Sequence, residues 1–196
     1  MLATLLSVMA LFISLVTASG CTLPTKINDR LTYATEKVLI ERYKKAPAID
    51  FVIDDATKKY QFEDTPSGLI MFPHTRQFPI GWTFAAYLEQ AARAALRPPS
   101  LNPSQVGVHL STCNMRYTNS AVGTGVDWVE IILTIDTTFP GQATPVPIKV
   151  RREVDAPSEE TVQMDLGDRA IVRAMEGLVT DFIDNVVERM TYKPQK

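Results

Sequence analysis

The sequence predicts an α+β domain of two layers, in which an antiparallel sheet carries two main helices on one face. Three observations predict this class. Three runs of alternating apolar and polar residues follow one another with short turns between them, which is typical of an antiparallel meander. Two longer segments repeat apolar residues at helical spacing. A further pair of short strand-like runs precedes them, so the expected order is ββ-α-βββ-α over residues 49–192.

The first pair of strands is expected as a hairpin. Residues 49–53 alternate as a strand, residues 54–57 are turn-like, and residues 59–63 return. Residues 74–79 are expected as a loop between two prolines. Upstream, residues 31–42 fit a short helix and a short strand equally well, because the run is too short for its period to decide.

The first long helix is expected over residues 81–97. Apolar side chains recur there at helical spacing, and the alanine-rich run 89–96 has high intrinsic helix propensity. Pro98 and Pro99 end it, because the residue before a proline avoids the helical region. The alanines make one side of this helix thin, which suits close packing on a sheet.

The three strands of the meander are expected over residues 106–117, 128–137 and 146–154. In the first, the apolar positions change parity between Leu110 and Cys113, which indicates either a β-bulge or a strand buried on both faces. The third strand has one basic face, with Lys149, Arg151 and Arg152 as candidate contacts for anionic lipid headgroups or an acidic partner. The alternative is an ordinary solvated strand face.

The last helix is expected over residues 168–190, with Asp168 near its start. Its apolar stripe consists of Ile171, Met175, Leu178, Phe182, Val186 and Met190. Its opposite face consists of Arg173, Glu176, Thr180, Asp184 and Glu188. The stripe predicts that this helix lies across the sheet. Residues 193–196 are expected to form a frayed tail.

The length and composition limit the class of protein but do not indicate an activity. The chain has 196 residues, and its net charge of −2 gives no reason to expect nucleic acid as a partner. Removing the first 20 residues leaves enough chain for one domain with a hydrophobic core. The oligomeric state does not follow from these properties.

The N-terminal segment is typical of export. Residues 2–16 carry no charged side chain and are too few to span a bilayer comfortably, and small residues follow them. The run Ala18-Ser19-Gly20-Cys21 resembles the lipobox of bacterial lipoproteins. The resemblance implies a signal peptide over residues 1–20, an acylated Cys21 that binds the membrane, and a lipidated tether over residues 21–48. Thr22, by resemblance to enterobacterial sorting, favours the outer membrane, with the domain in the periplasm.

Two other readings of this segment stay open. Val16-Thr17-Ala18 also fits an ordinary cleavage site, which would release a protein that begins at Ser19. Cys21 and Cys113 would then be able to pair in an oxidising compartment. The third reading is an uncleaved anchor helix.

No catalytic or metal-binding motif stands out, so we expect no enzyme, no metal and no cofactor. His109, Ser111 and Cys113 lie on alternate positions of one expected strand, too far apart along it for the imidazole to activate the thiol. His74 is the only other histidine. The remaining candidate site is a ligand cavity between sheet and helices, lined by Trp82, Phe84, Tyr87, Trp128 and Phe182. The default interpretation of these five residues is a filled core.

The order of elements is similar to that of small periplasmic domains of Gram-negative lipoproteins, including the lipopolysaccharide-assembly lipoprotein and transport-auxiliary lipoproteins. This resemblance implies a non-enzymatic outer-membrane lipoprotein that acts as an accessory or scaffold subunit of a cell-envelope complex, with an envelope protein as its partner. The alternative is a periplasmic protein that binds a lipid or another small ligand. No residue-specific motif supports the resemblance, so it assigns no functional residue.

Overall fold

In this computed structural model the described residues are 22–25, 27–64, 75–96, 102–119, 126–155 and 169–192. They form α-helices and β-strands in two sheets, which confirms the α+β class. Several predicted features lie outside the described residues: the signal peptide 1–20, Cys21, His74, Pro98 and Pro99, Asp168 and the tail 193–196. The chain divides into two units, Met1–Thr25 with Glu63–Phe78 and Lys26–Phe62 with Pro79–Lys196.

The first unit contains a small sheet with strand order β1-β4-β3. Its strands are β1 (Thr22–Pro24), β3 (Phe62–Asp64) and β4 (Thr75–Phe78). β3 begins one residue before the segment Glu63–Phe78 that belongs to this unit. β1 runs parallel to β4, with Thr22 opposite Thr75. The sequence predicted a loop over residues 74–79 and a tether directly after residue 21. Both predictions miss these strands, because three- and four-residue strands leave no readable period.

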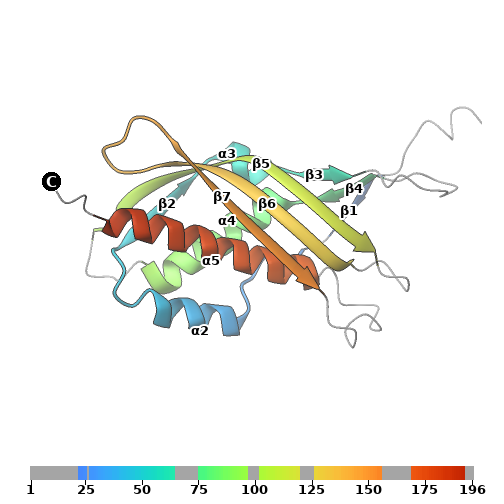
Figure 1. The fold of residues 1–196 in the computed structure, drawn as a ribbon, viewed down its shortest axis with the longest axis horizontal. Helices are drawn as coiled ribbons and strands as arrows, with labels where there is room; N and C mark the ends of the chain where they lie inside the picture. The colour runs from blue at the N-terminus through green and yellow to red at the C-terminus, as the bar shows by residue number, and fades with distance from the viewer. Residues whose placement is uncertain are drawn as a thin grey trace, which may run out of the picture. The chain divides into compact units, whose positions relative to one another are not determined.

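The second unit contains a four-stranded sheet with strand order β2-β5-β6-β7 (Figure 1). Its strands are β2 (Ile49–Ile53), β5 (Ser104–Asn119), β6 (Val126–Thr138) and β7 (Val146–Asp155). β5, β6 and β7 form the predicted antiparallel meander. Of the two alternatives for the parity change in β5, the structure has the bulge, because the register of β5 on β6 shifts between Leu110 and Thr112.

The predicted hairpin of β2 is wrong. Residues Asp55–Lys59 form a short helix, α3, and Asp54 caps it by accepting the Thr57 N–H at 2.7 Å. β2 instead pairs in parallel with β5. Parallel neighbours need a long crossover, and here the chain between them includes the alanine-rich helix. An aspartate followed by polar residues begins a helix or a turn equally well, so the sequence did not separate these outcomes.

The two long helices form where they were predicted. The first consists of α4 (Ile80–Ala91) and a π-helical turn, η1 (Ala92–Leu96), and the second is α5 (Arg169–Thr191). Figure 1 shows both on one side of the four-stranded sheet. Phe182 of α5 contacts Phe84 of α4 and Phe51 of β2, with ring centroids 5.7 and 5.9 Å apart. These aromatic contacts join sheet and helices in one core.

Residues 31–42, which fit a helix and a strand equally well by sequence, contain a further helix, α2 (Tyr33–Arg42). Its first turn contacts α5, because the Glu176 carboxylate accepts the Thr32 N–H at 2.5 Å and the Thr35 hydroxyl at 2.9 Å. The hydroxyl of Tyr43, just after α2, donates to Asp184 at 2.8 Å. The polar face of α5 is therefore covered by α2 at these positions. No described helix has the length and apolar character that crossing a membrane requires.

Candidate functional site

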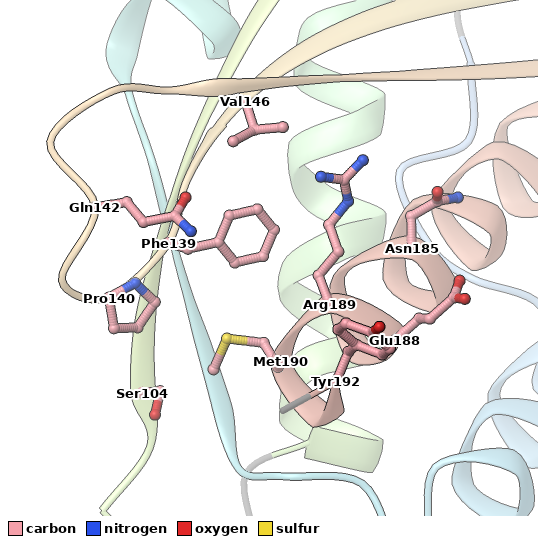
Figure 2. Close-up of a pocket in the computed structure, with 10 residues that line it drawn as sticks. All are labelled: Ser104, Phe139, Pro140, Gln142, Val146, Asn185, Glu188, Arg189, Met190 and Tyr192. Atoms are coloured by element: carbon pink, nitrogen blue, oxygen red, sulfur yellow. The ribbon is translucent and has the colours of Figure 1, made fainter. Parts of the chain in front are cut away.

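A groove with a volume of about 670 Å³ lies between the β6–β7 connection and the C-terminal end of α5 (Figure 2). Apolar side chains from both elements line it: Phe139, Pro140, Val146 and Met190. Polar side chains complete the lining: Ser104, Gln142, Asn185, Glu188, Arg189 and Tyr192. All of them belong to the second unit. The groove therefore combines apolar surface with hydrogen-bonding and charged groups.

A tight turn places the apolar wall. Gly141 has φ 76°, a conformation that glycine adopts without steric cost. The Gln142 N–H donates to the Phe139 carbonyl at 3.0 Å and closes the turn. The Phe139 side chain points into the groove (Figure 2), and the residue is only 6 % exposed. The sequence predicted this turn at residues 139–141, but it did not predict what the turn faces.

The end of α5 supplies the cationic side of the groove. Arg189 lies in the last turn, where the helix dipole favours a positive charge. The Asn185 side-chain amide donates to the Asp181 backbone carbonyl at 2.8 Å, and this hydrogen bond orients the Asn185 amide oxygen. Figure 2 shows Arg189 and Phe139 on opposite sides of the same space. Because Glu188 also lines the groove, its charged groups are of both signs, and the site suits an amphipathic ligand with a polar end.

The five aromatic residues predicted to line a cavity do not converge on one among the described residues. Phe84, Tyr87 and Phe182 are fully buried, and Phe84 and Phe182 contact each other in the core. Trp82 is 54 % exposed, and Trp128 donates its indole N–H to Glu153 at 3.1 Å. None of the five lines the groove of Figure 2.

Tyr87 illustrates why the core is closed. Its hydroxyl donates to the Asn28 carbonyl at 2.6 Å. Burial, together with the charges of Glu176 and Asp29, raises the pKa of Tyr87 well above its usual range. The side chain stays neutral and satisfied, so it is a packing residue.

The predicted basic face is split between the two faces of the sheet. Lys149 and Arg151 lie on the face without helices, whereas Arg152 lies on the helix-covered face and pairs with Asp181 of α5. Arg151 is also not a free cation, because its guanidinium lies 2.6 Å from the Glu130 carboxylate. Alternation along a strand separates residues 151 and 152, which the sequence prediction had grouped as neighbours.

The expected alignment of His109, Ser111 and Cys113 on one face is wrong. The bulge after Leu110 leaves His109 exposed on the face without helices and turns Cys113 into the core. The His109 Nδ1 lies 2.6 Å from the Asp54 carboxylate instead. Partial burial by itself raises the pKa of Asp54, but hydrogen bonds from Thr57 and His109 outweigh it and lower this pKa below its usual value.

Cys113 is a free cysteine, 8 % exposed. Burial raises the pKa of its thiol to about 12, so the thiolate needed for nucleophilic attack or metal binding is scarce at neutral pH. No group of three or more His, Cys, Asp or Glu side chains within the described ranges is placed to hold a metal ion.

Comparison with known proteins adds little. No protein-family model matches the sequence, and no curated protein matches it either. One solved structure that matches is described as the crystal structure of an uncharacterized protein. It is 10 % identical, has a TM-score of 0.33 and covers 88 % of this chain and 99 % of that chain. A likeness at this level does not bear on function.

The groove of Figure 2 was missed by sequence reasoning. Its turn and its helix were both predicted, yet Phe139 and Arg189 are far apart in the sequence. Only the crossing of α5 over β6 and β7 brings them together. The signals that the sequence does offer are the Phe139-Pro-Gly141 turn and a cation in the last turn of an amphipathic helix.

Proposed function

We propose that this protein is a non-enzymatic lipoprotein of the outer membrane, anchored through acylated Cys21, that acts in the periplasm as an accessory or scaffold subunit of a cell-envelope complex. The lipobox-like run Ala18-Ser19-Gly20-Cys21 supports the anchor. β1 begins at Thr22, one residue after the cysteine. An anchor at Cys21 would therefore hold the small sheet of the first unit close to the membrane.

The observation that carries the scaffold function is a preorganised polar surface, here called the outer face. It is the face of β5, β6 and β7 that has no helices on it. At its centre the side chain of Glu130 is only 8 % exposed, and Arg151 and Arg116 lie 2.6 and 3.7 Å from its carboxylate. Glu153 continues this network, because it accepts the Trp128 N–H and lies 3.5 Å from Arg151.

Such an arrangement favours protein recognition. The side chains are already held in place before a partner arrives, so binding orders fewer of them. Fixed charges of both signs also give specificity, because a wrong partner would bring like charges together. The partner that fits is an envelope protein whose surface has complementary charges around an apolar contact for Trp128.

Photo-crosslinking in the native host tests this function. A photoreactive amino acid at Arg116 or Thr134, both on the outer face, is expected to capture one envelope protein. The same amino acid at Glu41, an exposed position of α2, is the matched control and should not capture it. Capture of lipid alone from the outer-face positions would refute the scaffold function.

The anchor is tested separately by the intact mass of the mature protein extracted from its membrane. We expect a chain that begins at Cys21 and carries added acyl mass. A chain that begins at Ser19 without added mass would exclude the anchor, whatever the crosslinking result.

The second candidate function is binding of a lipid or small ligand, and the groove of Figure 2 favours it. Native mass spectrometry of the full chain, purified without delipidation, should then show a co-purifying ligand. The change Arg189→Gln should reduce its occupancy, whereas Arg93→Gln, at an exposed position of η1, should not. Absence of any ligand from the unmodified protein would contradict this candidate.

A further inference from the structure

β7 is the outermost strand of the four-stranded sheet, and within the described part of the chain one of its sides has no neighbouring strand. The ten residues Val146–Asp155 pair with β6 on one side. Among the described residues, no strand pairs with the other side, and no backbone or side-chain hydrogen bond reaches it. Figure 1 shows β7 at the margin of the sheet, beside α5. An edge of this length is a template for strand addition.

The charges along β7 are ordered by sign. The charged outer-face positions are, in sequence, Lys149, Arg151, Glu153 and Asp155. Two cations are followed by two anions, and all four residues are exposed. A strand that runs antiparallel reverses this order, so a second copy of β7 presents the complementary sequence of signs.

One register matches every charge. When Arg152 lies opposite the partner's Arg152, Lys149 faces the partner's Asp155 and Arg151 faces the partner's Glu153. By symmetry the other two outer-face positions are matched as well. Directly opposed side chains on neighbouring strands lie close enough to interact, so each of these pairs is favourable.

The neighbouring registers match fewer charges. Sliding one strand by two residues in one direction places Arg151 opposite the partner's Arg151. Sliding it in the other direction places Glu153 opposite the partner's Glu153. Opposed like charges destabilise strand pairing. The same charges that blunt this edge against unrelated strands therefore favour one antiparallel register with itself, in which all four charged outer-face positions are matched.

The helix-covered face is compatible with this register. Val150 there faces the partner's Val154, which pairs two apolar side chains. Arg152 faces its own copy, but its guanidinium lies against the Asp181 carboxylate of α5. Each arginine is thus neutralised within its own subunit, which limits repulsion between the copies.

We propose that two copies of this chain associate through β7 in antiparallel orientation, about a two-fold axis at Arg152, so that their four-stranded sheets become continuous. The interface is isologous, because the same strand contributes from both copies. Backbone hydrogen bonds supply affinity, and the charge order supplies the register. This inference stands apart from the proposed envelope function and does not depend on the anchor.

Charge exchange tests the interface on the full chain, purified in mild detergent, by light scattering after size exclusion. The wild-type chain is expected to form a dimer. Lys149→Glu and Asp155→Lys each create two like-charge pairs, so each should weaken the dimer by about tenfold or more. Neither residue forms an ion pair with another described residue, so the fold should be unaffected. The double variant Lys149→Glu/Asp155→Lys should dimerise again.

The control is Lys44→Glu, which makes the same charge change at an exposed position after α2 and should leave the dimer intact. A chain that is monomeric at every concentration overturns the proposal. So does a dimer that the single changes leave unaltered, or one that the double variant fails to restore.

Cysteine crosslinking tests the register. Arg152→Cys places two thiols opposite each other, where neighbouring Cα atoms are close enough for a disulfide. This variant should form a covalent dimer on oxidation, whereas the wild-type chain and Lys149→Cys should not. Mixing Lys149→Cys with Asp155→Cys should form one. Crosslinking of Lys149→Cys alone, or none at Arg152→Cys, would exclude the proposed register.

Discussion

The two margins of the four-stranded sheet are finished in different ways. At the β7 margin the edge is open among the described residues, and charged side chains protect it. At the opposite margin β2 pairs with only the first part of β5, and side chains take over where β2 ends. The Leu110 N–H donates to the Thr57 hydroxyl at 2.8 Å, and the Cys113 N–H donates to the Tyr60 hydroxyl at 3.0 Å.

A sheet edge can therefore be closed by side chains or left available to a partner strand. Thr57 of α3 and Tyr60, which follows α3, satisfy two donors of β5 with their hydroxyl groups, so this stretch of edge has no free N–H to offer a partner at those positions. β7 has no such cover among the described residues, and apart from Pro147 near its start it is protected by charged side chains. Charged side chains hinder the addition of most strands, but a strand with the complementary order of charges can pair with this edge.

The largest effect is expected from Gly81→Ala, which would break the closed margin. A Cβ atom at Gly81 would lie 1.8 Å from the backbone carbonyl oxygen of Thr57. Backbone cannot move aside cheaply, so α3 would have to separate from α4. We expect a loss of about 3 kcal/mol of unfolding free energy or more, measured by urea denaturation.

Gly177→Ala is the matched control for this change. A Cβ atom there would meet only the flexible side chain of Arg152, at 2.9 Å from its Nε. We expect a change within about 0.5 kcal/mol, because alanine also favours the helix. Equal losses in the two variants would show that the Thr57 carbonyl is not the limiting contact.

The next effect is expected from Thr57→Val, which keeps the shape of a fully buried residue and removes its hydroxyl. The Leu110 N–H would lose its acceptor and remain buried. We expect a loss of about 2 kcal/mol by urea denaturation, together with faster hydrogen exchange at the Leu110 amide. Unchanged exchange at that amide would contradict the proposed closure of this margin.

A smaller, pH-dependent effect is expected from Asp54→Asn. The lowered pKa of Asp54 in the folded chain means that its carboxylate stabilises the fold above the unfolded pKa of about 3.9. This contribution is lost as the pH falls through the folded pKa. Both side chains of the Asp54–His109 pair are almost half exposed, so we expect only about 0.5 kcal/mol near pH 6.

The measurement is the difference in unfolding free energy between wild type and Asp54→Asn as a function of pH. The difference should shrink as the pH falls below about 4 and vanish in strong acid. A difference that grows on acidification would have the wrong sign for a lowered pKa.

The smallest effect is expected from Asp181→Asn beside the open margin. It removes the partner of Arg152, but both side chains of this pair are partly exposed. Pairs of this kind contribute little, so we expect a loss of at most about 0.5 kcal/mol by urea denaturation. If the β7 dimer forms, this variant should also weaken it, because the opposed Arg152 side chains would no longer be neutralised. A dimer strengthened by Asp181→Asn would contradict that role.

Helices and strands that are long enough to show a hydrophobic period can be predicted from the sequence alone. The meander strands, the bulge in β5 and both long helices follow from alternation, helical spacing and the Phe139-Pro-Gly141 turn. The sequence also identified the apolar stripe of α5, in which Ile171, Met175, Leu178, Phe182 and Val186 are all fully buried. These signals are local, so they survive without knowledge of the rest of the chain.

Tertiary structure decided everything that depends on which segments meet. β2 became parallel to β5 because α3 replaced the turn of the expected hairpin, and the chain reaches β5 only after the predicted alanine-rich helix α4. Glu176 was predicted on the polar face of α5, yet it lies buried against α2, which the sequence left undecided between helix and strand. Arg151 and Arg152 are neighbours in the chain but lie on opposite faces of the sheet. The physical reason is that period and propensity act within one segment, whereas pairing partners, buried charges and the groove of Figure 2 are set by contacts between residues far apart in sequence.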